Sequence, residues 1–90
     1  MTSEKMRVIL QVTIEARDLD EVSGALAELP EVLDVYEVTG QSDIVVIIEA
    51  DDVLDFRNML KNRILRIDGV KTTVSSVIMY VHKKDGKSSR

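Results

Sequence analysis

The segment Ile44–Ile48 is apolar at every position and consists entirely of β-branched residues. Such side chains favour extended backbone, and a run this short is typical of a strand rather than of a buried helix. Successive side chains of a strand point to opposite faces of its sheet. This strand must therefore bury apolar groups on both faces, and that requirement constrains the fold more than any other feature of the sequence.

The other elements follow from the spacing of apolar residues. Alternation predicts strands, and apolar residues at helical spacing predict two helices. Asp18 and either Asp51 or Asp52 are the expected helix N-caps, and Pro30 and Gly69 are expected to end the helices. The predicted elements are a strand at 7–15, a helix at 19–29, strands at 32–39 and 43–50, a helix at about 53–67 and a strand at 70–81.

This order of elements predicts a particular α+β architecture. Strand, helix, strand, strand, helix, strand is the split βαβ, or ferredoxin-like, arrangement (βαββαβ). Both helices should cover one face of a four-stranded antiparallel sheet, which leaves the opposite face without a cover.

The uncovered face predicts an oligomer. On this reading it exposes Ile9, Val45, Ile47, Val77 and Met79. A contiguous apolar patch of that size is unusual on a monomer and usually marks an interface. The simplest partner is a second copy, which gives a two-fold dimer packed sheet to sheet, a dimeric α+β barrel. A monomer with one very hydrophobic strand is the alternative.

The chain is short and has few other means of reinforcing its core. Its 90 residues suit one domain. A chain of this size buries only about 60% of its unfolded surface. It contains no cysteine and a single histidine, His82, so neither disulfides nor a metal site is expected. The lack of cysteine fits a reducing cytoplasm, and oligomerisation remains as the source of extra stability.

The net charge of −4 is unevenly distributed along the chain. Residues 82–90 carry +3 and the remainder carries −7, so direct DNA binding by the acidic body is not expected. We expect one domain at 1–83 and a disordered basic tail at 84–90, with contact between the tail and phosphate as the alternative. No apolar run is long enough to span a membrane, and the polar residues Met1–Lys5 do not read as a signal peptide.

Two runs of the sequence carry a resemblance to a known family. The run LPEVLDVYEVTGQSD at 29–43 and the run LRIDGVKTT at 65–73 resemble the C-terminal domain of the leucine-responsive (Lrp/AsnC) transcriptional regulators. That domain is called the RAM domain, for regulation of amino-acid metabolism. The resemblance extends from Met6 to about Lys83.

The resemblance implies a fold, an assembly and a function. It implies a ferredoxin-like fold, face-to-face dimers and a ring of dimers such as an octamer. Amino-acid effectors would sit at the contacts between neighbouring dimers. The chain lacks the family's helix-turn-helix domain, so it looks like a stand-alone form that could co-assemble with full-length Lrp/AsnC regulators. It also has Ser42 where the family usually has tyrosine.

The turn between the two middle predicted strands is the candidate site for such an effector. Backbone N–H groups at 40–42 and the hydroxyls of Thr39 and Ser42 could bind a carboxylate. Asp43 could pair with an ammonium group, and Gln41 could contact a polar ligand side chain. The alternative is a plain hairpin turn, in which Gly40 adopts the backbone conformation that the turn requires and Asp43 accepts hydrogen bonds from turn amides. The candidate ligand-binding residues are Tyr36, Thr39, Gly40, Gln41, Ser42 and Asp43.

The remaining polar groups favour structural roles. Asp51, Asp52 and Asp55 suit a helix start better than a metal site. His82 has no evident acid partner, and Tyr80 suits packing. We expect no cofactor and no catalytic residue. A small dimeric ferredoxin-like enzyme of the monooxygenase or isomerase type and an ACT-type regulatory domain are the alternative functions.

Overall fold

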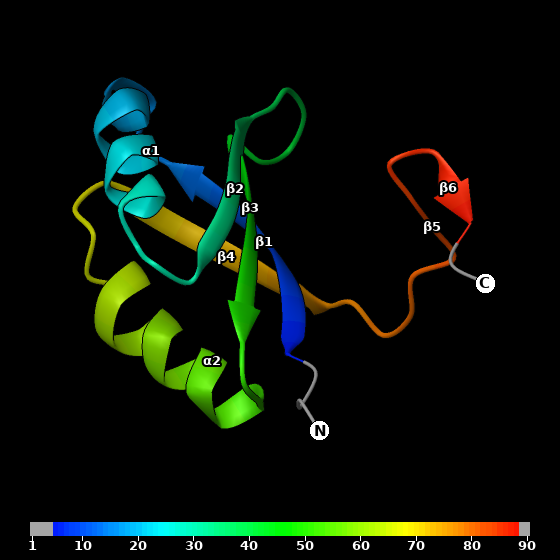
Figure 1. Ribbon diagram of the computed structural model, residues 1–90. Coiled ribbons are helices and arrows are strands. Elements are labelled where there is room, and N and C mark those ends of the chain that lie inside the picture. Colours follow the sequence, from blue (N-terminus) through cyan, green and yellow to red (C-terminus); the bar gives the residue numbers. More distant parts are fainter. Residues whose placement is uncertain (1–4, 89–90) are drawn as a thin grey trace.

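The computed structural model describes residues 5–88, which form a four-stranded sheet with a helical layer and a projecting C-terminal segment (Figure 1). Within this range no helix is long and apolar enough to cross a membrane. The elements are β1 (Met6–Ile14), the 3₁₀ turn η1 (Ala16–Asp18), α1 (Leu19–Ala27), β2 (Val32–Glu37), β3 (Ile44–Ala50), α2 (Val53–Met59), the π-helical turn η2 (Leu60–Ile64), β4 (Val70–Val77), β5 (Lys83–Lys84) and β6 (Lys87–Ser88).

The four-stranded sheet has the order β2-β3-β1-β4 and is antiparallel throughout. The apolar strand β3 is central, and α1 and α2 lie on the same face of the sheet (Figure 1). The predicted ferredoxin-like βαββαβ fold is therefore confirmed.

The core lies between the sheet and this helical layer. Alternate residues of β1 and β3 point into it, and the fully buried Leu10 and Val46 lie directly opposite each other in the strand register. The buried core residues are Val8, Leu10, Val12, Ile14, Val22, Leu26, Ile44, Val46, Ile48, Ala50, Phe56, Met59 and Ile64.

The two helices begin differently. Asp52 caps α2 as expected, because its side chain accepts a hydrogen bond of 2.8 Å from the backbone N–H of Asp55. The expectation that Asp18 caps α1 is wrong, since its side chain makes no capping hydrogen bond. The 3₁₀ turn η1 leads directly into α1, so the chain is already helical where the cap was expected.

The second helix turns most of its expected apolar stripe to the core, since Phe56 and Ile64 are buried and Leu60 and Ile67 pack against the core. The helical spacing of Val53 with these residues predicts that it joins them, but Val53 is 64% exposed, while Met59 is buried. The helix continues into the π turn η2, where the Leu65 N–H donates to the Leu60 carbonyl over 2.8 Å.

The opposite face of the sheet has an apolar centre, as the sequence predicts, but its members differ. By register Ile9, Val45 and Ile47 share this face with Val74 and Tyr36. Val74 is 58% exposed and Tyr36 is 52% exposed, while the other three are partly exposed. We call Ile9, Tyr36, Val45, Ile47 and Val74 the outer-face cluster.

Two residues expected on that face lie elsewhere. Val77 is opposite the buried Val8, so it points to the helix side of the sheet, where 45% of it stays exposed. Met79 lies beyond the end of β4 and is 93% exposed. A register shift at Thr13–Ile14 changes how β4 aligns with β1, and this alignment cannot be counted from sequence alone.

The C-terminal segment differs from the disordered tail expected at 84–90. Its described part forms a two-residue hairpin in which Lys83 pairs with Ser88 and Lys84 with Lys87. Asp85 and Gly86, at φ 51° and 77°, form the turn. These positive values suit the tight hairpin turn that an Asp-Gly pair favours. The remainder of the expected tail, 89–90, and the N-terminal residues 1–4 lie outside the described residues.

Candidate ligand-binding site

The loop between β2 and β3 holds most of the residues expected to bind a ligand. Its two ends are joined by a hydrogen bond of 3.0 Å from the Val38 N–H to the Asp43 carbonyl. Gly40 has φ 115°, in the region that side chains disfavour. A Cβ added at Gly40 would meet no atom within 4 Å, so the glycine serves the backbone conformation and not a close approach.

Asp43 fixes this loop to the neighbouring strand. Its Oδ2 accepts a hydrogen bond of 2.9 Å from the backbone N–H of Ile14, and its own N–H donates to the Val12 carbonyl over 3.0 Å. One carboxylate oxygen of Asp43 is thus used in holding β1 beside the start of β3. The plain-turn alternative had Asp43 bonding turn amides, whereas its carboxylate bonds the Ile14 amide of the neighbouring strand β1.

A hollow of about 310 Å³ lies on one side of the loop. Gln11 and Val45 face each other across β1 and β3 on the outer face of the sheet, so the hollow adjoins that face. Its lining residues are Gln11, Val38, Thr39, Gln41, Ser42 and Val45.

The structure brings together three of the six predicted site residues. Thr39, Gln41 and Ser42 line the hollow. Gly40 shapes the loop, and Tyr36 lies opposite Val45 within the outer-face cluster.

Asp43 instead faces a second hollow on the other side of the loop. That hollow also measures about 310 Å³ and includes Leu19, which belongs to the helical layer. Thr39 lines both hollows, so the loop forms a wall between them.

Sequence reasoning missed Gln11 as a site residue. Its position in β1 is 28 residues before Thr39, and only the strand register shows that it lies opposite Val45 beside the loop. A polar residue on the outer face of a strand was the available signal, but it did not specify which loop the side chain would approach.

The chemistry of the first hollow is neutral and polar. Two amides, from Gln11 and Gln41, and two hydroxyls, from Thr39 and Ser42, surround it. Amides and hydroxyls both donate and accept hydrogen bonds, so they can bind a carboxylate and an ammonium group alike. Val38 and Val45 supply an apolar wall. This combination suits a small polar or zwitterionic molecule.

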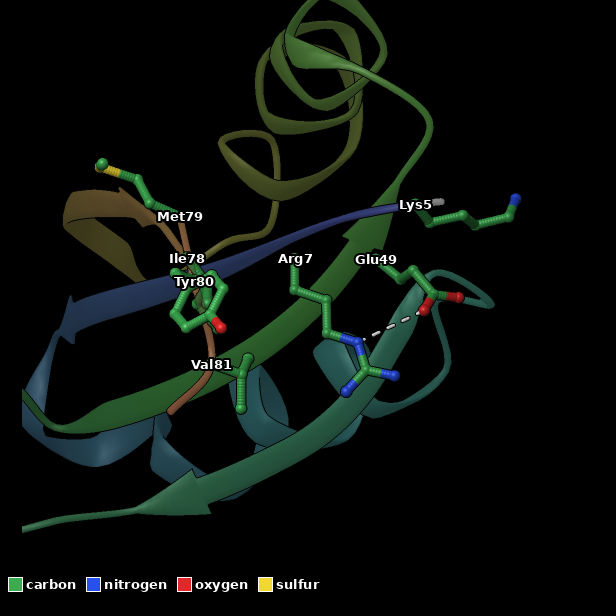
Figure 2. Close-up of a pocket in the computed structure, with 7 residues that line it drawn as sticks. All are labelled: Lys5, Arg7, Glu49, Ile78, Met79, Tyr80 and Val81. Carbon is green, nitrogen blue, oxygen red and sulfur yellow. Dashed lines mark ion pairs between the residues drawn. The ribbon is translucent and has the colours of Figure 1, made fainter. Parts of the chain in front are cut away.

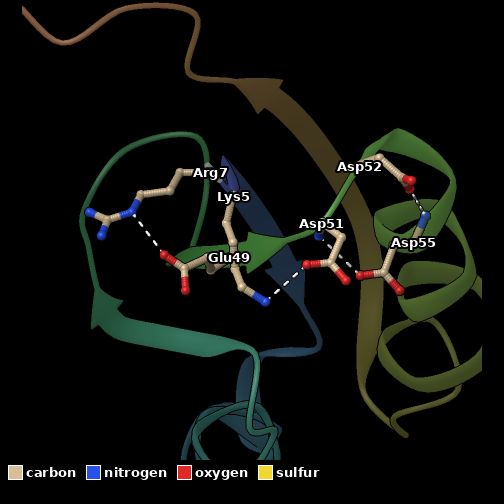
Figure 3. A network of polar contacts seen from close by, with 6 residues as sticks. All are labelled: Lys5, Arg7, Glu49, Asp51, Asp52 and Asp55. Carbon is tan, nitrogen blue, oxygen red and sulfur yellow. Dashed lines mark hydrogen bonds and ion pairs between the residues drawn. The ribbon is translucent and has the colours of Figure 1, made fainter. Parts of the chain in front are cut away.

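The acidic residues at the start of α2 serve the helix (Figure 3). The Asp55 carboxylate accepts a hydrogen bond of 3.2 Å from the Asp51 N–H, which complements the cap made by Asp52. Lys5 Nζ lies 2.9 Å from Asp51 Oδ1, and this hydrogen bond and the charge of Asp51 raise the pKa of Lys5. Within residues 5–88 no group of three potential metal-ligating side chains is assembled.

Comparisons with known proteins give this site a context. The sequence profile of the Lrp/AsnC ligand binding domain matches residues 7–88. The HTH-type transcriptional regulator FL11 of Pyrococcus horikoshii is 34% identical over 79 residues, which cover 88% of this chain and 52% of the regulator. The chain thus spans about half the length of the curated relatives it matches.

Solved structures agree on the fold. The Thermus thermophilus protein TTHA0845 superposes with a TM-score of 0.82 at 25% identity, over 88% of this chain and 99% of that one. A transcriptional regulator from Neisseria meningitidis, solved as a complex with L-Met, gives a TM-score of 0.77 at 23% identity. That match covers 93% of this chain and 54% of the regulator.

Proposed function

The chain belongs to the Lrp/AsnC ligand binding domain family, and from that premise we propose that it binds an amino-acid-type effector and modulates transcription as an oligomer. The proposal assigns it no catalysis, since its named relatives are transcriptional regulators. The family match favours this role over an ACT-type domain or a small enzyme. The proposed place of action is the cytoplasm.

One observation carries the proposal. The neutral polar hollow beside the loop shares Val45 with the outer-face cluster, so the hollow and the exposed apolar face are continuous. The L-Met complex of the Neisseria meningitidis regulator supports an amino acid as the effector. In this role Thr39, Gln41 and Ser42 bind the ligand directly, Gly40 shapes the loop, and Tyr36 and Asp43 border the site.

Pairing of two chains through the outer-face cluster is part of the proposal. Exposed apolar side chains across neighbouring strands form the kind of patch that usually marks an interface. Several such dimers could form a ring, as in an octamer. A ligand bound in the hollow beside the outer face would then be affected by how the dimers assemble. Regulation then follows because the ligand's affinity differs between assembly states.

The same surfaces would allow assembly with a longer regulator. The 34% identity to FL11 of P. horikoshii extends over most of this chain, so a related domain would present a comparable face. In a mixed oligomer the longer partner would contact DNA and this chain would contribute ligand sites. Co-purification of a tagged copy with a helix-turn-helix regulator tests this part.

A thermal-shift screen against the twenty amino acids tests ligand binding. A ligand at 100 times its Kd stabilises the native state by about 2.7 kcal/mol. For a domain of this size that corresponds to a Tm increase of roughly 10 °C or more. We expect at least one amino acid to produce such a shift at a fixed protein concentration.

Paired variants locate the binding. Gln41→Ala and Ser42→Ala should reduce the shift, whereas Ser75→Ala, an exposed serine on β4, should leave it unchanged. If no amino acid raises the Tm, or if the shift is equal in all three variants, the proposed site is wrong.

A further inference from the structure

The segment that follows β4 stands away from the rest of the molecule. Residues 78–88, which we call the arm, begin at Ile78, whose N–H donates to the Arg7 carbonyl over 2.9 Å, and then project away from the helices and the four-stranded sheet (Figure 1). Met79 is 93% exposed and Tyr80 is 67% exposed, although both are large and hydrophobic. The arm therefore offers apolar side chains that the body of its own chain does not cover.

The hairpin at the end of the arm is too small to be stable by itself. It has only two residues in each strand, and all of its residues from Lys83 to Ser88 are exposed. A short two-stranded hairpin is marginally stable in water unless it packs against something else. Its Asp85–Gly86 turn nevertheless specifies a defined shape. A hairpin without its own core would gain stability by packing against another surface.

The base of the arm borders an open slot of about 450 Å³ on the sheet (Figure 2). Figure 2 shows Tyr80 and Val81 beside Arg7, whose Nε lies 3.4 Å from Glu49 Oε2. Arg7 and Glu49 are opposite each other in the register, on the same face as Ile9 and Ile47. The slot is thus continuous with the outer-face cluster, and one partner could occupy both.

Charge also favours an acidic surface as the partner of the arm. Lys83, Lys84 and Lys87 against Asp85 give the arm a net charge of +2. Residues 5–77 carry 8 basic and 14 acidic side chains, for a net charge of −6. Opposite charges steer association between such surfaces. The body of this chain has the required charge, but the arm extends away from its own body.

We propose that the arm docks on a second copy of this chain, with Met79 and Tyr80 buried against the partner and the hairpin lysines against its acidic body. This rests on the sheet-to-sheet pairing in the proposed function, and it adds a distinct contact to that pairing. When two arms are exchanged across a two-fold axis, each arm makes an apolar contact and a charged contact with the other subunit.

Sedimentation equilibrium of arm variants tests this contact. Burial of a large apolar side chain stabilises an interface, and a symmetric dimer loses this contribution twice when the side chain is replaced. The dimer Kd should therefore rise roughly 100-fold. We therefore expect that increase for Tyr80→Asp. The matched control is Leu54→Asp on α2, which is similarly exposed at 62% against 67% and should change the Kd less than about 3-fold.

Cross-linking between isotopically distinct chains shows where the arm goes. Light and ¹⁵N-labelled chains are mixed, and a carbodiimide joins lysines to nearby carboxylates. Links from Lys83, Lys84 or Lys87 to body carboxylates should include light–heavy pairs. The Lys5–Asp51 pair, at 2.9 Å, is the internal control and should link only within one chain.

The outcomes separate this inference from the proposed dimer. If Tyr80→Asp associates as tightly as Leu54→Asp, or if the arm lysines link only within single chains, the arm does not dock on a twin, while the sheet pairing can still hold. If the unaltered chain is monomeric at micromolar concentration, the sheet pairing and the docked arm are both wrong.

Discussion

Removing the Asp43 side chain should lower the stability of the fold even when no ligand is present. The Asp43 carboxylate accepts the Ile14 N–H at 2.9 Å in a partly buried setting, beside the point where the β1–β4 register shifts. In Asp43→Ala that N–H loses its acceptor. In Asp43→Asn the amide oxygen can still accept it, while the negative charge is gone.

The expected magnitude follows from this one contact. Leaving a buried donor unsatisfied costs about 1–3 kcal/mol, so we expect Asp43→Ala to lose about 2 kcal/mol of unfolding free energy. For a domain of this length that is a fall in Tm of roughly 10 °C. Asp43→Asn should lose less than about 1 kcal/mol because it keeps the hydrogen bond.

The assay is urea and thermal unfolding of the three proteins at one protomer concentration, since association couples to stability. An Asp43→Ala protein within about 0.5 kcal/mol of the unaltered chain would refute this account of the residue. With an amino-acid ligand in hand, Asp43→Asn also isolates the charge. If the ligand-induced increase in Tm disappears in this stable variant, the negative charge of Asp43 contributes to ligand binding.

The helix junctions and turns give further tests. Gly69 has φ 99°, and a Cβ there would lie 2.9 Å from side-chain atoms of Asp18 and Val22, so Gly69→Ala should cost about 3 kcal/mol. Gly40→Ala is its matched control, because Gly40 has φ 115° but a Cβ there meets no atom, and it should cost only about 1 kcal/mol of unfolding free energy in urea. Equal losses in the two variants would contradict the proposed clash at position 69 with Asp18 and Val22. Asp52→Ala should cost about 1 kcal/mol through loss of the 2.8 Å cap to Asp55, whereas Asp51→Ala removes only an exposed ion pair and should stay within about 0.5 kcal/mol. If these two aspartate variants unfold at the same urea concentration, the cap is not what stabilises the start of α2.

Local patterns in the sequence predict most of this fold. Alternation in β1 identifies Val8, Leu10, Val12 and Ile14 as one face, and all four are buried. The β-branched run of β3 becomes one of the two central strands, with both of its faces apolar. These predictions hold because each depends on the period of a single element, which a sequence displays directly.

Predictions that require alignment between elements are less accurate. Val77 was expected on the outer face, but its position depends on a register shift at the other end of the β1–β4 pair, at Thr13–Ile14. The approach of Gln11 to the loop depends on the β1–β3 register in the same way. A strand sequence shows which residues share a face, but it does not show which residues of the next strand they meet.

The C-terminal hairpin was missed for another reason. Asp85–Gly86 is a recognised hairpin signal, but the residues that flank it are lysines and a serine rather than alternating apolar residues. Polar flanks cannot form a core within one chain. They are consistent with a segment whose packing partner lies on another molecule, as we propose for the arm.

The central claim is that the apolar outer face of the sheet is covered by a second copy of this chain. Sedimentation equilibrium of the unaltered chain from low to high micromolar concentration tests it most directly, with circular dichroism to verify folding. Chains of 10.1 kDa should sediment as a dimer or as an even multiple of that mass. A folded species of 10.1 kDa across the whole range would contradict the claim.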